Sequence, residues 1–181
     1  MLLEAPAGST TERTASEQAK WFAIQTRSRH EKKVATELRE KGLSIFLPLY
    51  SSVHRWSDRR KTVQLPLFPG YVFVQTVYSP ENRIAVLQVP GVAYFVGDQG
   101  RGTPIPEKQI EDIRTILEKD IPFELYPFVK VGQRVRIRGG SLDGLEGTLL
   151  AKNADQSLAV SIELIQKTVV VRVTGYDLDV I

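Results

Sequence analysis

The chain contains no cysteine, and only two histidines and one methionine among its 181 residues. Without cysteine there is no disulfide scaffold, no Cys-based zinc finger, no iron–sulfur cluster and no thiol nucleophile. The histidines, His30 and His54, stand in basic segments and lack the flanking residues that mark a catalytic triad. We therefore expect a protein that is not an enzyme and that needs no cofactor or metal ion.

Long apolar runs are also missing, since none approaches the ~20 residues that span a bilayer. The N-terminus lacks the basic and apolar regions of a secretory signal, so we expect a cytoplasmic protein without membrane association. The chain also has little excess of positive over negative charge. The formal net charge is +3, and such a small value identifies no partner until the charges are placed.

Composition changes along the chain and divides it into four segments. Residues 1–19 are polar and small, so they predict a disordered tail. Residues 20–119 mix helical and strand patterns, whereas residues 129–181 are almost entirely β. Residues 120–128 have two prolines and no period, which predicts a linker. The expected class is α+β, with two small domains.

The first domain should contain an antiparallel sheet with helices. Its strands begin with Trp21–Thr26, and the run from Gly70 to Val77 gives the clearest strand signal. Helices are expected near 29–41, 80–87 and 106–119, the first ending at Gly42 in a left-handed conformation. The second domain has short strands joined by glycine-rich turns, with Leu158, Val160 and Ile162 pointing to one side and Ala159 and Ser161 to the other. This pattern predicts a small, SH3-like β-barrel rather than helices.

Two basic clusters are candidates for contact with an anionic polymer. The first lies at a helix start, where positive charge opposes the helix dipole and so suggests an anionic partner such as a phosphate backbone. The second lies in a loop that also contains Trp56, which could stack on a base. The alternative is a solvated basic surface. The candidate residues that would face nucleic acid are Arg27, Arg29, Lys32, Arg55, Arg59, Arg60 and Lys61.

An aromatic strand is the third candidate site. Along a strand, Tyr71 and Phe73 point to one side, and Val72 and Val74 point to the other. If the valines face the core, the aromatic side chains form an outward patch of the kind that binds a partner. The alternative is that both faces of the strand are covered.

Several segments, in their order along the chain, resemble the NusG family. They begin with Trp21-Phe22-Ala23-Ile24, a Glu31-x-x-Val34-Ala35 helix and Phe46-Leu47-Pro48. The block Phe68-Pro69-Gly70-Tyr71-Val72 follows, and Val131 to Gly147 is similar to a KOW motif. The resemblance covers about residues 21–181. It implies a NusG N-terminal domain followed by a KOW-containing SH3-like barrel.

The resemblance implies a transcription elongation and antitermination factor that suppresses pausing. In that family the N-terminal domain binds a coiled coil of the largest RNA polymerase subunit through an apolar surface. The matching candidates here are Phe68, Tyr71, Phe73 and Phe95. The first basic cluster would then face upstream or non-template DNA. We expect a monomer.

The KOW domain of the family recruits other factors through a loop, which matches Leu164 and Ile165 here. A small-subunit ribosomal protein is an expected partner. General factors tend to have Ile-Phe-Gly-Arg where this chain has Leu164-Ile165-Gln166-Lys167, and that departure argues against Rho binding. It favours a specialised paralogue, similar to RfaH or to the antiterminators of polysaccharide operons. The alternatives are a general NusG that links polymerase to Rho and the ribosome, and a ribosome-associated KOW protein that binds RNA.

Overall fold

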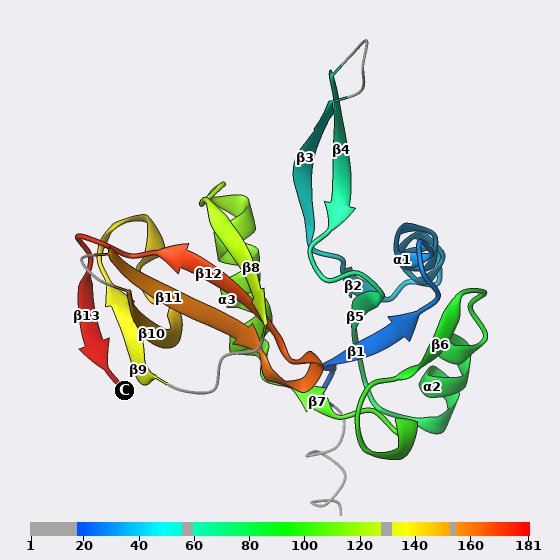
Figure 1. The fold of residues 1–181 in the computed structure, drawn as a ribbon. Coiled ribbons are helices and arrows are strands. Elements are labelled where there is room, and N and C mark those ends of the chain that lie inside the picture. Colours follow the sequence, from blue (N-terminus) through cyan, green and yellow to red (C-terminus); the bar gives the residue numbers. More distant parts are fainter. Residues whose placement is uncertain (1–17, 56–59, 128–131, 153–154) are drawn as a thin grey trace, which may run out of the picture.

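The computed structural model of the chain describes residues 18–55, 60–127, 132–152 and 155–181 (Figure 1). Side chains are described in these ranges except at 53–55, 60–61, 126–127, 151–152 and 155. Most of the expected tail, residues 1–17, therefore lies outside the described part. No helix among the described residues is long and apolar enough to cross a membrane.

The N-terminal sheet is antiparallel and is built around strand β1 (Lys20–Thr26). On one side β1 pairs with β5 (Tyr71–Thr76), which pairs in turn with β2 (Ser44–Phe46). On the other side β1 pairs with β6 (Val92–Phe95) and with the short β7 (Pro104–Ile105). These five strands create two faces, because side chains alternate along each strand.

The first face, which we call the valine face, is covered by two helices. It contains Phe22, Ile24, Val72 and Val74, and these side chains pack with Val34, Ala35 and Leu38 of α1 (Glu31–Glu40). Helix α2 (Pro80–Leu87) adds Val86 and begins at Ser79, whose hydroxyl accepts a hydrogen bond from the Asn82 amide at 3.1 Å. The expected valine core and the expected end of α1 at Gly42, φ +83°, are both confirmed.

A two-stranded hairpin extends away from the N-terminal sheet (Figure 1). It consists of β3 (Leu49–Arg55) and β4 (Arg60–Pro66) and confirms the hairpin that was expected as one alternative for residues 51–62. An isolated hairpin is only marginally stable, so its base needs support. Lys32 of α1 supplies part of it, because its Nζ donates to the Gln64 carbonyl at 2.6 Å.

The C-terminal sheet has six antiparallel strands in the order β13-β9-β10-β11-β12-β8. Its core strands confirm the β pattern expected after residue 129, and Leu158, Val160 and Ile162 are buried. Among its described residues the helical turns are short 3-10 segments, Gly140–Leu142 and Glu163–Ile165. The strands are β9 (Gln133–Arg138), β10 (Glu146–Lys152), β11 (Asp155–Ile162), β12 (Lys167–Arg172) and β13 (Asp177–Val180).

The segment expected to be a linker is largely a strand. Residues Phe123–Pro127 form β8, which pairs with β12 from Phe123 opposite Val171 to Pro127 opposite Lys167. Proline is tolerated here because β8 is an edge strand and Pro127 is its last residue. Residue 128, the last of the expected linker, lies outside the described part. The connection from α3 (Glu107–Glu118) to the C-terminal sheet is therefore short.

Candidate functional site

Helix α3 lies between the two sheets. Its side chains Ile110, Ile113 and Ile116 are fully buried. They belong to one hydrophobic cluster that also includes Trp21 and Phe73 of the N-terminal sheet and a large part of the C-terminal core. The Arg114 guanidinium lies 5.2 Å from the Phe46 ring centroid and 6.0 Å from that of Trp21, a cation–π arrangement. One side of α3 therefore packs on the second face of the N-terminal sheet.

Another side of α3 makes polar contacts with the C-terminal sheet and its turns. The Lys108 Nζ donates to the Gly144 carbonyl at 2.8 Å, and the Gln109 side-chain oxygen accepts from the Glu163 amide at 3.2 Å. Near the end of the helix, the Lys119 ammonium donates to the Ser141 carbonyl. Lys108 and Lys119 are about three helical turns apart, so both contacts lie on one side of the helix.

Asp112 is the buried charge of this interface. Its side chain is 7% exposed and forms an ion pair with Lys108. The carboxylate also accepts the backbone amide of Glu146. Loss of water raises the pKa of Asp112 above its ordinary value, and the hydrogen bond and charge of Lys108 only partly oppose this effect. The Glu146 carboxylate is held in turn by Arg136, with N···O distances of 2.6 and 2.8 Å.

The second face of the N-terminal sheet, which we call the aromatic face, is covered. Phe68 and Phe73 are 1% and 0% exposed, with ring centroids 6.2 Å apart, and Phe46 lies 6.1 Å from Phe73. Phe46 and Tyr71 are partly accessible. The expectation that these aromatic side chains form an outward patch is wrong for Phe68 and Phe73. The physical reason is that α3 and the C-terminal core complete the same cluster, so both faces of β5 are covered.

Phe95 lies on the opposite face from Phe73. It pairs with Ile24 in the sheet register, is 0% exposed and contacts Phe22 at a centroid distance of 6.0 Å. The residue of β6 that shares the aromatic face is Tyr94, which is 50% exposed. Alternation along one strand separates these neighbours, and only the pairing register shows which of them faces which side.

A row of three side chains crosses the aromatic face at one end. Gln25 of β1 is paired with Tyr71 on one side and with Tyr94 on the other. Burial raises the pKa of the Tyr71 phenol, with a smaller contribution from the neighbouring Tyr94. No pattern in the sequence places Gln25 and Tyr94 beside Tyr71, because their proximity depends on the strand order. We call Gln25, Tyr71 and Tyr94 the tyrosine row.

The basic residues of the first cluster have different surroundings. Arg27 and Arg29 are exposed in the turn between β1 and α1, and neither belongs to an ion pair among the described residues. Lys32 instead supports the hairpin through Gln64. In the second cluster, Arg59 and the side chains of Arg55, Arg60 and Lys61 lie outside the described part.

The turn that contains Phe68 is held by a carboxylate that the sequence analysis did not single out. Glu31, at the start of α1, is 5% exposed, and its Oε1 accepts the Gly70 amide at 2.8 Å. The Gly70 carbonyl accepts the Thr26 amide, also at 2.8 Å. A buried acid on an otherwise basic helix start was the available signal, because such a residue is rarely buried without a partner.

The KOW partner residues also lie in the interface with α3. Ile165 is 5% exposed and Leu164 packs partly buried against the same cluster. The preceding Glu163 amide is bound by Gln109 of α3. Both regions that the sequence marked for partners, on the aromatic face and at this turn, therefore meet around one helix.

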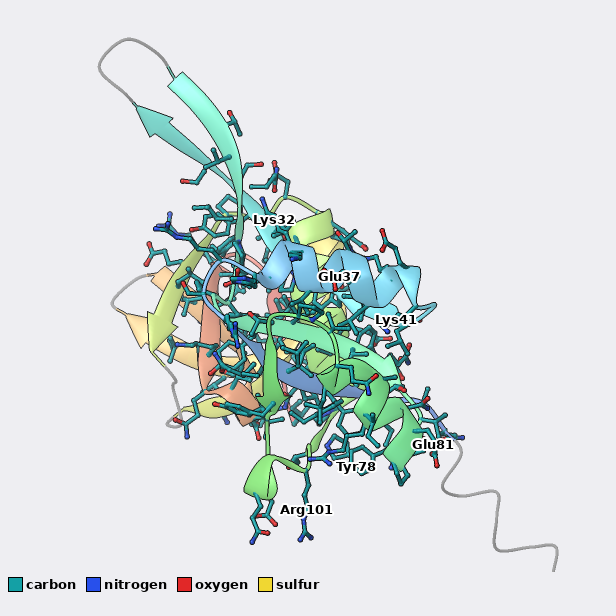
Figure 2. All side chains as sticks on the ribbon, turned by 90° about the vertical axis from the view of Figure 1, so that its right-hand side faces the viewer. Lys32, Glu37, Lys41, Tyr78, Glu81 and Arg101 are labelled. Carbon is teal, nitrogen blue, oxygen red and sulfur yellow. The ribbon has the colours of Figure 1, made fainter. Side chains whose placement is uncertain are left out.

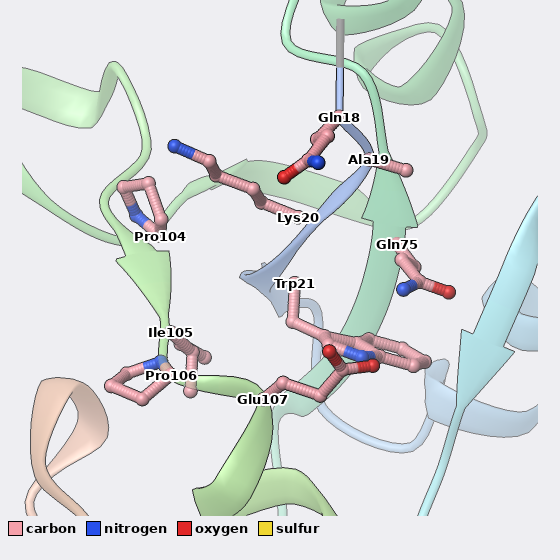
Figure 3. A pocket seen from close by; sticks show the side chains of 9 residues that line it. All are labelled: Gln18, Ala19, Lys20, Trp21, Gln75, Pro104, Ile105, Pro106 and Glu107. Carbon is pink, nitrogen blue, oxygen red and sulfur yellow. The ribbon is translucent and has the colours of Figure 1, made fainter. Parts of the chain in front are cut away.

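A cavity of about 380 Å³ opens beside the aromatic face, where β7 meets the start of α3. Trp21, Ile105 and Gln75 line it together with the charged Lys20 and Glu107 (Figure 3). Among the described residues no group of three acidic or histidine side chains is placed to hold a metal ion.

Comparison with known proteins places the chain in a family. Residues 19–114, more than half of the chain, match the family model described as transcription termination factor nusG. The transcription termination/antitermination protein NusG of Lactococcus lactis is 32% identical over 151 residues, which cover 75% of this chain and 80% of that protein. The protein of the same description from Staphylococcus aureus (strain Mu50) is 32% identical over 136 residues, covering 67% of this chain and 72% of its own length.

A solved structure of Thermotoga maritima NusG, determined to describe domain interaction in that protein, is similar to this one. The TM-score is 0.52 at 25% sequence identity, and the match covers 85% of this chain and 93% of that chain. It supports the same succession of a mixed α/β part and a β-rich part. The chain belongs to the NusG family of transcription termination/antitermination factors.

Proposed function

We propose that this chain is an elongation and antitermination factor specialised to particular operons. It binds RNA polymerase through the aromatic face and recruits further partners through its C-terminal sheet. The observation that carries the proposal is the convergence of both expected contact regions on α3. An aromatic, apolar face of this kind is suited to a helical partner such as a coiled coil, which inserts apolar side chains between aromatic rings.

In this proposal the two sheets separate before polymerase binds. The apolar cluster joins the aromatic face, α3 and the C-terminal core, so a polymerase helix and the C-terminal sheet would compete for neighbouring positions. Tyr71 is a partly accessible residue of the face, beside the exposed Tyr94, and makes direct contact in this proposal. Phe68 and Phe73 shape the surface from beneath it, and Phe95 supports the sheet from the opposite side.

In this proposal Arg27 and Arg29, which are exposed in the turn that follows β1, face upstream or non-template DNA. Exposed guanidinium groups can bind phosphates and stack on a base. This contact should weaken as salt rises, because each neutralised phosphate releases counterions. The hairpin carries the second basic cluster and extends away from the sheet (Figure 1), so we assign its tip to the same class of partner.

The paired arginines of the C-terminal sheet argue against an RNA-binding role for it. Arg134, Arg136 and Arg138 alternate along β9 and would form a cationic ladder if they were free. Each is paired within the chain, with Glu146, Glu163 or Asp179. The C-terminal sheet is thus better suited to protein partners. We propose a small-subunit ribosomal protein, and we do not propose Rho, because Leu164 and Ile165 replace the residues typical of general factors.

Capture of core RNA polymerase by the full chain tests the proposal. Tyr71→Ala should reduce the binding free energy by about 1–3 kcal/mol, as for an interface aromatic residue. The matched control is Tyr78→Ala, because Tyr78 is also a half-exposed tyrosine but lies beside α2 and Arg101, as Figure 2 shows. Equal capture of both variants and the unmodified chain would refute the proposed polymerase surface.

A further inference from the structure

Among the described residues, one ion pair lies at the contact between α3 and the C-terminal sheet. It joins Lys108 and Asp112, which are both on α3. Asp112 is nearly inaccessible, while Lys108 keeps a side-chain exposure of 42% and also reaches the Gly144 carbonyl. Ile113 and Ile116 on the same helix are fully buried, so apolar packing adjoins the pair. An apolar side chain would fill this place more stably, since a buried ion pair often costs more in lost hydration than it returns.

The groups around Asp112 explain why its charge is tolerated without being favoured. From α3 itself, Lys108 supplies the only cation in an ion pair with it among the described residues. From β10, Glu146 supplies a favourable amide but also an unfavourable carboxylate. The Glu146 carboxylate forms ion pairs with Arg136 and with Arg134, which lies 3.7 Å from it. These two cations of β9 therefore pair with Glu146 and not with Asp112.

We propose that the Lys108–Asp112 pair is a release element, which keeps the contact between α3 and the C-terminal sheet weak enough to open. This inference rests on the proposed function, in which opening uncovers the aromatic face and the Leu164–Ile165 turn. The buried Asp112 charge acts against closure, and Lys108 compensates for most of that cost. Removing the lysine should therefore open the chain, whereas neutralising the aspartate should close it further.

Substitutions of the two partners should change the ratio of closed to open molecules in opposite directions. This result distinguishes a release element from an ordinary stabilising salt bridge. In an ordinary bridge, loss of either partner weakens the contact. Here Asp112→Asn keeps an oxygen that can accept the Glu146 amide and removes the charge that must be desolvated. Lys108→Met keeps the apolar stem of the side chain and leaves the Asp112 charge buried and uncompensated.

The distance between the sheets can be measured on the full chain by single-molecule energy transfer. The chain has no cysteine, so Glu40→Cys on α1 and Arg172→Cys on β12 introduce the only two dye sites. Both positions are exposed and lie on different sheets or their helices. The variants are Lys108→Met and Asp112→Asn, and the matched control is Glu111→Gln, an exposed acid on the same helix.

We expect Lys108→Met to lower the ratio of closed to open molecules by about tenfold. Removing one partner of a fully buried ion pair would have a larger effect, but Lys108 is partly solvated. Asp112→Asn should raise the ratio by about threefold, a smaller change because Lys108 already offsets most of the cost of burying the charge. Glu111→Gln should leave it unchanged. An opening caused by Asp112→Asn, or an unchanged ratio in Lys108→Met, would overturn the proposal.

Polymerase capture by the same variants separates this inference from the proposed function. Lys108→Met should bind polymerase more strongly and Asp112→Asn less strongly if opening uncovers the binding face. If the distance ratios change as expected and polymerase capture does not, the release element stands and the proposed polymerase surface fails. Circular dichroism of each variant confirms that both sheets remain folded, which is expected because neither substitution adds volume to the core.

Discussion

Phe73→Ala should strongly destabilise the N-terminal part of the protein rather than selectively weaken a partner contact. The Phe73 side chain is 0% exposed and lies between the rings of Phe46 and Phe68, at centroid distances of 6.1 and 6.2 Å. Its neighbours on β1 and on α3 belong to the same cluster. Truncation leaves a cavity that these rigid elements cannot close, because α3 is also held by its contacts with the C-terminal sheet.

The size of the effect follows from the burial. Removing a fully buried phenyl ring from a core costs about 3–5 kcal/mol of unfolding free energy. Small domains have about 5–15 kcal/mol in total, so the variant loses a large share of its stability. For a domain of roughly 100 residues, each kcal/mol lowers Tm by about 4 °C or more, so we expect a decrease of at least about 12 °C.

Urea unfolding followed by Trp21 fluorescence measures this effect. Trp21 is 6% exposed and packs against Phe46 at 6.5 Å, so it reports on the aromatic face. A Trp56→Phe background removes the second tryptophan of the chain. The control is Ile84→Ala, because Ile84 on α2 is 52% exposed and its loss should change stability by no more than about 0.5 kcal/mol.

A Phe73→Ala variant that loses less than about 1 kcal/mol would refute this reasoning, since a loss that small is not that of a fully buried ring. The aromatic face would then be loosely packed, and the apparent burial of Phe73 would not describe the protein in solution. The expected result instead means that polymerase binding is best examined with Tyr71→Ala, whose partly accessible side chain contributes less to the core.

Three further predictions concern α3, the Phe68 turn and the loop after β6. The fraction of closed molecules should rise as pH falls, because burial raises the pKa of Asp112 in the closed form. This extra stability of the closed form is complete below the ordinary pKa of 3.8 and is lost as pH rises through the pKa of the closed form. Energy transfer between about pH 7 and pH 4 measures the closed fraction, and Asp112→Asn should remove most of its pH dependence. Glu31→Ala should lower the unfolding free energy by about 1–3 kcal/mol, because the buried Gly70 amide loses its acceptor; urea unfolding compared with Glu40→Ala, an exposed acid on the same helix, checks this. Gly97→Ala should lower Tm, because a Cβ there would lie 2.4 Å from the Thr103 amide nitrogen at φ +136°, whereas Gly100→Ala, with open space at its Cβ, should lower it less; calorimetry of both variants distinguishes them.

The sequence by itself determined the succession of elements and one of the two core faces. Period-2 alternation identified Val72 and Val74 as a buried face, and helical spacing identified Val34, Ala35 and Leu38 as their partners. Glycine-rich turns between β-branched runs were enough to predict β structure after residue 129. These features depend on local spacing and local backbone preference, and both are visible in a single chain.

Only the tertiary structure decided what covers the aromatic face. Phe73 looked like a surface residue because its own strand cannot show that α3 and the C-terminal core lie against it. Phe95 lies on the valine face and Tyr94 on the aromatic face because the pairing of β1 with β6 sets the register. Asp112 looked like one more polar residue of an amphipathic helix, and its burial arises because α3 packs on two sheets at once. Side-chain exposure at these positions is set by contacts between segments distant in the sequence, so no local pattern contains it.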